Sequence, residues 1–220
     1  MPRLRVGVLI SGRGSNLQAL IDAAADPHYP AEIAIVISNR ADAAGLARAE
    51  VAGIPRQIIA DADRAVFAAV ADRRLREAGV ELVALAGFMR ILDTAFVEAW
   101  ADRMINIHPS LLPAFPGLHP QRQALASGVK FSGCTVHFVR AAVDSGPIIA
   151  QAAVPVEDGD DEDLLAARIL TAEHRLYPLA VRLFAEGRLR IDGNRVIVDG
   201  GVAPGTVALN PTKNLASGRR

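Results

Sequence analysis

The chain has 220 residues, of which 51% are hydrophobic and 22% charged, a composition typical of a globular protein rather than a disordered one. It carries 24 basic and 24 acidic residues, and the resulting formal net charge of zero argues against nucleic acid as a partner. A small phosphorylated ligand is still compatible with this charge, because backbone N–H groups alone can hold one phosphate.

The first half of the chain alternates between strand and helix patterns. Short apolar runs predict strands, and the segments between them have the apolar spacing of helices. The expected strands are Val6–Ile10, Ile33–Ile37, Arg56–Ile59, Leu82–Ala86 and Met104–Ile107. The expected helices are Ser15–Ala25, Ala43–Ala52, Ala65–Ala78 and Thr94–Trp100. This alternation predicts an α/β fold with a mostly parallel, Rossmann-like sheet and helices on both faces.

The alternation stops at Pro109. Residues 109–128 are rich in proline and predict a loop. Beyond this loop we expect an antiparallel pair of strands, a long helix bent near Pro178, and a hairpin around Asp192-Gly-Asn194. The strands are Cys134–Val139 and Ile148–Val156, the helix is Asp163–Glu186, and the hairpin spans 188–198. Residues 201–220 lack periodicity and predict a disordered tail, which leaves a single domain over 1–200.

Cysteine content and hydropathy indicate a cytoplasmic location. Cys134 is the single cysteine, so no internal disulfide can form, and this fits a reducing compartment. No apolar stretch approaches the roughly 18 residues of a membrane span, and the N-terminus lacks the apolar core of a signal peptide. We therefore expect a soluble protein without a membrane partner.

A glycine-rich turn, Ser11-Gly-Arg-Gly-Ser-Asn16, lies between the first strand and the first helix. Its glycines permit a tight turn, and the N–H groups of Gly14, Ser15 and Asn16 would face an anion from the start of the helix. A dinucleotide fingerprint would require glycine at position 17, where the chain has leucine, and an acidic residue after the second strand. The turn therefore favours one phosphate over NAD, although a turn of this kind is often only structural.

Asn106 and His108 lie two residues apart at the end of a predicted strand, so their side chains project on the same side. A carboxamide donor beside an imidazole suits an oxyanion that forms between them. Asp144, in a predicted turn, is the third candidate, because a carboxylate beside the imidazole would favour its charged form. Taken singly, a histidine at a strand end and an aspartate in a turn are more often structural.

The remaining histidines have weaker claims, and His137 is interpreted as a hydrogen-bonded strand residue. No HExxH motif, cysteine pair or carboxylate triplet indicates a metal site, so no metal is expected.

Five motifs, in order, resemble the phosphoribosylglycinamide formyltransferase family over about residues 5–200. They are Ser11–Asn16, Ala86–Leu92, Asn106–Pro113, Pro116–His119 and Asp144–Pro147. The resemblance implies a formyltransferase fold on one continuous sheet, with a nucleotide-binding half at about 1–108 and a folate-site half at 109–200. It also implies transfer of a formyl group from 10-formyltetrahydrofolate to glycinamide ribonucleotide, with tetrahydrofolate released.

The same resemblance assigns roles to individual residues. Asn106, His108 and Asp144 match the catalytic residues, and Gly14, Ser15, Asn16 and Glu173 match contacts to the ribonucleotide. The folate contacts are matched by Arg64, by Met89, Arg90, Ile91 and Leu92, by Asn106, and by the loop of Arg140, Ala141, Ala142, Val143 and Asp144. Two positions depart from the family pattern: Leu170, where a polar residue is expected, and Pro120 after His119. A homodimer is compatible with the resemblance.

Three other functions are compatible with parts of the sequence. Methionyl-tRNA formyltransferase usually has an Arg-Gly segment after Leu-Leu-Pro and a further C-terminal domain, whereas this chain has Pro113-Ala-Phe-Pro-Gly117. Formyltetrahydrofolate deformylase has an additional N-terminal domain, whereas the first strand here begins almost at once. A non-catalytic nucleotide-binding module would explain the glycine turn and would leave Asn106, His108 and Asp144 without a role.

Overall fold

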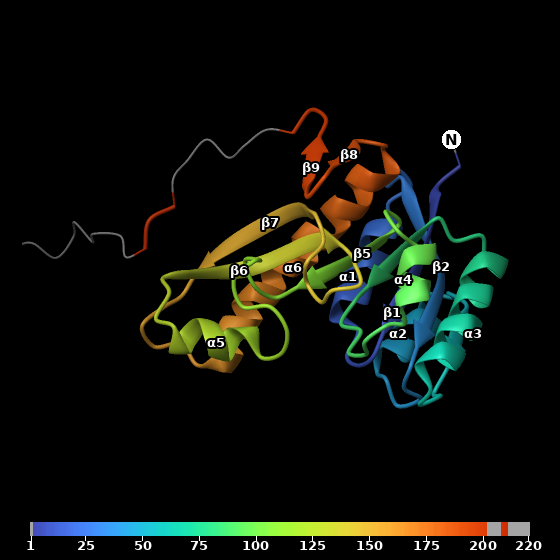
Figure 1. Cartoon of the computed structure of the whole chain (residues 1–220), viewed down its shortest axis with the longest axis horizontal. Helices are drawn as coiled ribbons and strands as arrows, with labels where there is room; N and C mark the ends of the chain where they lie inside the picture. The colour runs from blue at the N-terminus through green and yellow to red at the C-terminus, as the bar shows by residue number, and fades with distance from the viewer. Residues whose placement is uncertain (1, 202–207, 211–220) are drawn as a thin grey trace, which may run out of the picture.

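A computed structural model of the chain describes residues 2–201 and 208–210, and one nine-stranded sheet runs through it (Figure 1). The strand order is β3-β2-β1-β4-β5-β6-β7-β9-β8. The strands are β1 Leu4–Ile10, β2 Ala31–Ser38, β3 Arg56–Ile58, β4 Leu82–Leu85, β5 Met104–His108, β6 Phe131–Phe138, β7 Ile148–Pro155, β8 Leu189–Asp192 and β9 Arg195–Val198. Strands β1 to β5 pair in parallel, whereas β5–β6 and β6–β7 are antiparallel. The predicted α/β class, with a parallel half continued by antiparallel strands, is confirmed.

Helices cover both faces of the parallel half. They are α1 Ser15–Ala24, α2 Gly45–Val51, α3 Arg64–Glu77, α4 Thr94–Ala99 and α6 Glu162–Ala185. The sixth helix, α5 Pro120–Ala126, lies beside the antiparallel half and packs against α6 (Figure 1). One hydrophobic core lies between the sheet and α1, α2 and α6, and a second lies between the sheet and α3 and α4 (Figure 1). In β1, β2 and β4 most residues are buried, because layers of helices enclose these strands on both sides.

The order of the strands creates a switch point between β1 and β4. The chain passes from β1 to β2 and β3 on one side, and then returns to place β4 on the other side of β1. Loops that leave the carboxyl ends of β1 and β4 therefore diverge, and ligands of open α/β sheets bind in such crevices. The hydroxyl of Ser11, after β1, accepts a 2.8 Å hydrogen bond from the N–H of Met89, after β4, and donates to Asn39 Oδ1, after β2.

Residues 109–128, expected to be a loop, contain the short helix α5. His119 adopts left-handed φ and ψ of 56° and 46° at its start, and Pro120 takes the first helical position, where the missing N–H costs nothing. Seven residues are too few to display a clear helical period. Pro120, which departs from the family pattern, is therefore the first residue of a helix.

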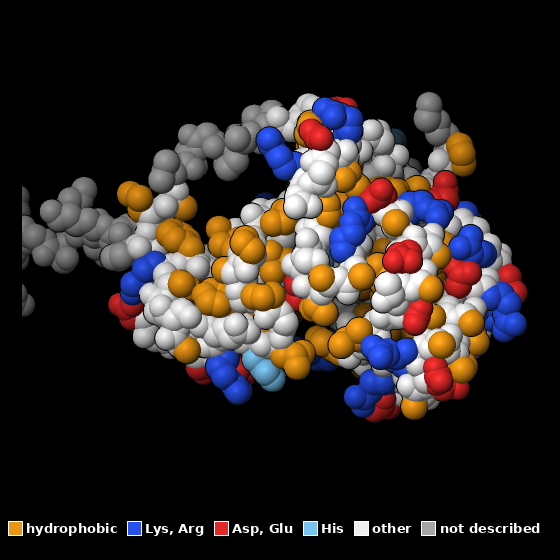
Figure 2. Space-filling view, viewed as in Figure 1, with side chains coloured by type: hydrophobic (Ala, Val, Ile, Leu, Met, Phe, Trp, Pro, Cys, Tyr) orange, Lys and Arg blue, Asp and Glu red, His pale blue; other side chains and the backbone are white. Residues whose placement is uncertain are grey.

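The long predicted helix and the hairpin are both confirmed. Helix α6 runs as one element through Pro178, and β8 and β9 pair in antiparallel across Gly193. The expected tail lies outside the described residues except for 201 and 208–210. Within the described ranges, no helix is both long and apolar enough to cross a bilayer. Figure 2 shows charged side chains gathered over α3 on one side of the molecule, and mainly uncharged surface over β6 and β7.

Candidate active site

The end of β5 brings Asn106 and His108 to one face of the sheet. The antiparallel register sets His137 of β6 opposite Asn106, and Nδ2 of Asn106 lies 3.3 Å from Nε2 of His137. His108 and His137 are both buried, with 6% and 2% of their surface exposed. The strand pairing thus concentrates an amide and two imidazoles in a sheltered place, where electrostatic interactions are stronger than in water.

Asp144 reaches the same cluster from the loop that follows β6. Oδ2 of Asp144 lies 3.4 Å from Nδ1 of His108, and Oδ1 lies 3.7 Å from Nε2 of His137. The N–H of Gly117 donates a 2.8 Å hydrogen bond to Oδ2. The three residues predicted from the sequence therefore lie together, and His137 joins them.

The loop holds Asp144 in a conformation that few side chains adopt. Its φ is +52°, in the left-handed region. Gly146, two residues on, packs against the backbone of β6, and a Cβ there would lie 1.7 Å from the carbonyl oxygen of Phe138. Only glycine permits this approach, and the approach turns the carboxylate towards the histidines. Backbone strain of this kind, held by surrounding contacts, is common at functional sites.

Both ring nitrogens of His108 face acceptors. Nε2 lies 3.0 Å from the carbonyl oxygen of Phe115, which can only accept, and Nδ1 faces the carboxylate of Asp144. Contacts on both sides of the ring hold the imidazole in one orientation. The position of His108 therefore directs one nitrogen at Asp144 and the other at the carbonyl of Phe115.

The pKa of Asp144 results from opposing effects. Burial alone would raise it, but the hydrogen bond with His137, the N–H of Gly117 and the charge of His108 together hold the pKa below the usual range of an aspartate. Asp144 is consequently ionised at neutral pH and can serve as the counter-ion of His108. An imidazole that is held between a carboxylate and an amide donor can, when protonated, stabilise an oxyanion and deliver a proton.

Sequence analysis assigned His137 no role in the site. Its Nδ1 donates to the carbonyl of Phe138 at 2.9 Å, which leaves Nε2 directed at Asn106 and Asp144. Because side chains alternate along β6, the sequence could show that His137 and Thr135 lie on the same face. It could not show that His137 lies opposite Asn106, since this depends on the register between β5 and β6. Register in such a pair is fixed by tertiary packing, so this neighbour could not be derived from spacing.

The glycine-rich turn forms the start of α1, as predicted. Gly14 is the N-cap residue, with φ of +69°, and no side chain caps the helix. Within the described part of the chain, no acceptor takes the N–H groups of Gly14, Ser15 or Asn16. Three donors at the positive end of a helix suit an anion such as a phosphate.

Glu173 of α6 lies against the same turn. Nδ2 of Asn16 donates a 2.8 Å hydrogen bond to Oε2 of Glu173, which is only 5% exposed. Burial raises the pKa of Glu173 to about 7. The hydrogen bond from Asn16 lowers this pKa, but by less than burial raises it. Oδ1 of Asn16 is buried without a partner. Polar atoms that stay unsatisfied in a buried place are a sign of a ligand or of ordered water.

The raised pKa of Glu173 gives a prediction for stability. Between pH 4.5 and about 7 the carboxyl is ionised in the unfolded chain but protonated in the fold, so stability falls as pH rises through that window. We expect Glu173→Gln, which keeps the acceptor for Asn16, to be more stable than the parent at pH 8 by up to about 3 kcal/mol. The two should be alike below pH 4. Denaturant unfolding at both pH values measures this difference, and equal stability at pH 8 would contradict a buried carboxyl.

The residues matched to folate contacts lie on two loops, at the start of α3 and, for Asn106, on β5. Met89 and Ile91 follow β4 and are 76% and 62% exposed, while Val143 on the loop after β6 is 60% exposed. Exposed apolar side chains on loops beside a polar cluster are suited to a flat, partly apolar ligand. Leu92 packs against the second core, and Ala141 and Ala142 are exposed.

The three arginines of this set are arranged differently. Arg90 donates to the carbonyls of Asp61 and Ala62, and so ties the loop after β4 to the segment before α3. Arg64 is exposed at the first residue of α3. The side chain of Arg140 pairs with Asp102 at 2.5 Å, so this residue offers the site its backbone rather than its charge.

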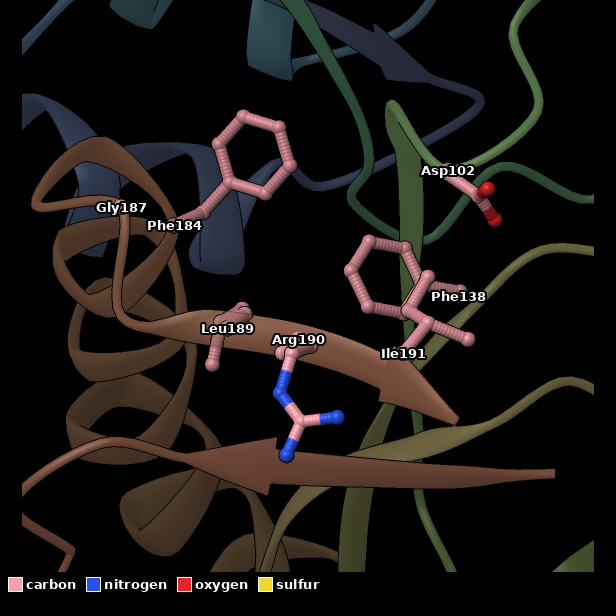
Figure 3. Close-up of a pocket in the computed structure, with 7 residues that line it drawn as sticks. All are labelled: Asp102, Phe138, Phe184, Gly187, Leu189, Arg190 and Ile191. Atoms are coloured by element: carbon pink, nitrogen blue, oxygen red, sulfur yellow. The ribbon is translucent and has the colours of Figure 1, made fainter. Parts of the chain in front are cut away.

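A cavity of about 470 Å³ lies elsewhere, beneath β8. Its walls include Phe138, Phe184, Leu189 and Ile191, with Asp102 at the rim (Figure 3). Phe138 follows His137 on β6, and successive strand residues point to opposite faces. The cavity is therefore on the other side of the sheet from the catalytic candidates. In the described part of the chain, no group of three or more His, Cys, Asp or Glu residues is arranged to hold a metal ion.

Comparisons with known proteins identify relatives of this chain and structures with the same fold. A family model described as formyl transferase matches residues 4–181. The trifunctional purine biosynthetic protein adenosine-3 of Drosophila pseudoobscura pseudoobscura is 57% identical over 194 residues, which are 86% of this chain and 14% of that protein. The chain thus spans a small part of that relative.

Two relatives match along almost their whole length. Phosphoribosylglycinamide formyltransferase of Escherichia coli strain K12 is 48% identical over 200 residues, which cover 90% of this chain and 94% of that protein. The crystal structure of glycinamide ribonucleotide transformylase 1 from Symbiobacterium toebii is 55% identical with a TM-score of 0.86, over 89% of this chain and 94% of that one.

Proposed function

The chain belongs to the formyl transferase family, and we propose that it transfers a formyl group from 10-formyltetrahydrofolate to the amine of 5'-phosphoribosylglycinamide in purine biosynthesis. The products are N-formylglycinamide ribonucleotide and tetrahydrofolate. The observation that carries the proposal is the cluster of Asn106, His108 and Asp144, with the imidazole of His108 held between a carboxylate and a carbonyl.

The chemistry needs no covalent intermediate with the protein. The neutral substrate amine attacks the formyl carbon on N10 of the folate, and a bond forms from nitrogen to carbon as the C=O becomes an oxyanion. The free N–H of Asn106 and the cation of His108 stabilise this charge. The C–N10 bond then breaks as N10 takes a proton, delivered by His108 directly or through water. The attacking nitrogen releases one proton to water, and His108 takes a proton back from solvent, so the enzyme returns to its initial state. Asp144 orients His108 and balances its charge.

Positioning supplies the rest of the rate. The N–H groups of Gly14, Ser15 and Asn16 hold the phosphate, and Glu173 accepts from the ribose. Arg64, the segment from Met89 to Leu92 and the loop from Arg140 to Asp144 border the folate. Holding two reactants in register can contribute as much as 7–11 kcal/mol, by the general effective-molarity argument. In this proposal residues 1–108 carry the ribonucleotide and 109–200 complete the folate site, in a cytoplasmic protein.

An assay of turnover tests the proposal. Purified protein is added to glycinamide ribonucleotide and a 10-formyl folate, and we expect the absorbance change of folate deformylation, with one formylated ribonucleotide per folate consumed. Formate release that ignores the ribonucleotide would identify a deformylase instead. Formylation of charged methionyl-tRNA, with none of the ribonucleotide, would identify the tRNA enzyme. Ribonucleotide binding without any turnover would leave only a nucleotide-binding module.

A further inference from the structure

The first residue of helix α2 packs against the backbone of the glycine-rich turn. Gly45, its first residue, donates from its N–H to the carbonyl of Gly12 at 2.9 Å. Gly14 and Gly45 meet backbone to backbone, since a Cβ on Gly14 would lie 2.5 Å from the Cα of Gly45. The turn and the helix therefore form one packed unit, although more than 30 residues separate them along the chain.

Arg48, one turn further along α2, holds the next carbonyl of the turn. Its Nε donates a 3.0 Å hydrogen bond to the carbonyl oxygen of Arg13. Its Nη1 donates at 3.2 Å to Oε1 of Gln18 on α1, and Nε2 of Gln18 in turn donates to Asp22. Within the described residues no carboxylate lies within 4 Å of the guanidinium, so its charge is not neutralised by direct pairing.

The bond from Arg48 fixes a donor on the far side of the peptide. The peptide between Arg13 and Gly14 is planar and trans, so its C=O and N–H point in opposite directions. Holding the carbonyl of Arg13 against α2 therefore directs the N–H of Gly14 away from α2. That N–H is the first of the three donors without an acceptor at the start of α1.

Two further observations indicate that a ligand is expected there. The turn has no side-chain cap, and no acidic residue lies in the first turn of α1 to occupy the donors. Beside them, Oδ1 of Asn16 is unpartnered on a residue that is only 8% exposed. The positive charge of Arg48, which contacts the peptide before these N–H groups, makes the electrostatic potential at the start of α1 more favourable for an anion.

We propose that Arg48 is a positioning residue for the phosphate of the substrate: it orients the N–H of Gly14 through the Arg13 carbonyl and adds an unpaired positive charge behind the turn. The inference rests on the proposed function, since it assumes that the phosphorylated substrate binds at this turn. The side chain of Arg48 contacts Arg13 and Gln18 and is not part of the cluster of Asn106, His108 and Asp144, so we expect its loss to affect binding of the ribonucleotide rather than the chemical step.

The test compares steady-state constants of Arg48→Met with those of the parent. We expect KM for glycinamide ribonucleotide to rise about tenfold, while kcat and KM for the folate stay within about twofold. Arg48→Lys keeps the charge but presents a single nitrogen in place of the planar guanidinium fork, so it should restore only part of the affinity. Arg56→Met is the matched control, because Arg56 forms an exposed pair with Glu50 behind the same helix.

A second substrate separates orientation of the phosphate from general damage. Against glycinamide riboside, which lacks the phosphate, Arg48→Met and the parent should have the same kcat/KM. Equal losses with both substrates, or an unchanged KM for the ribonucleotide, would overturn the role of Arg48 while turnover by the parent kept the proposed function intact. A parent without turnover would overturn the function itself. Should Arg48→Met fold poorly, Gln18→Met removes one acceptor of Arg48 and should raise the same KM about threefold.

Discussion

Replacing His108 by alanine is expected to lower kcat by about 100-fold or more without unfolding the protein. The substitution removes the cation that faces the developing oxyanion and the group that delivers a proton to N10. Loss of one such electrostatic contact typically costs about 3 kcal/mol in the transition state. Because the contact strengthens only as charge develops, KM for either substrate should change little.

Asn106→Ala should give a loss of similar size, since it removes the second oxyanion donor. His28→Ala serves as the control for both, because His28 is exposed in the loop before β2 and lies outside the cluster. Circular dichroism and thermal unfolding establish that each variant is folded. Turnover of either variant within a few-fold of the parent would remove that residue from the mechanism.

The fold could be predicted from the sequence where each element carries its own signal. Apolar runs in β1, β2 and β4 are buried on both sides, so they read as continuous hydrophobic segments. Helix boundaries followed capping residues such as Gly79, which has a left-handed φ of +62° after α3. Helix α5 was missed, because its seven residues show no period.

The candidate site was predictable only in part. The spacing of Asn106 and His108 placed them on one face, because strand side chains alternate, and this depends on local geometry alone. His137 and Arg48 could not be found in that way. His137 reaches Asn106 through an antiparallel register, and Arg48 reaches Arg13 through the contact of two glycines. Both depend on how distant segments pack, and single-sequence patterns do not report that packing.

Asp144→Asn is expected to lower kcat by roughly two to four orders of magnitude, as the loss of a buried carboxylate that orients a catalytic imidazole can do. The amide is nearly the same size, so the hydrogen bond from Gly117 can survive. The imidazole of His108, however, loses the carboxylate that orients it and that balances its charge in the transition state. Steady-state turnover of the variant and of the parent at pH 7 measures this loss. A variant that turns over within a few-fold of the parent would remove Asp144 from the mechanism.

The same substitution has a signature in stability with its own pH dependence. The folded pKa of Asp144 is depressed, so its ionised form stabilises the fold at neutral pH and this contribution is lost as pH falls through the folded pKa. We expect Asp144→Asn to be less stable than the parent at pH 7 and the difference to narrow below pH 4. Denaturant unfolding at pH 7 and pH 3 measures it. If the difference in unfolding free energy between the parent and the variant were the same at pH 7 and pH 3, the carboxylate would act through its shape alone. A contribution from its negative charge would disappear once the carboxylate is protonated.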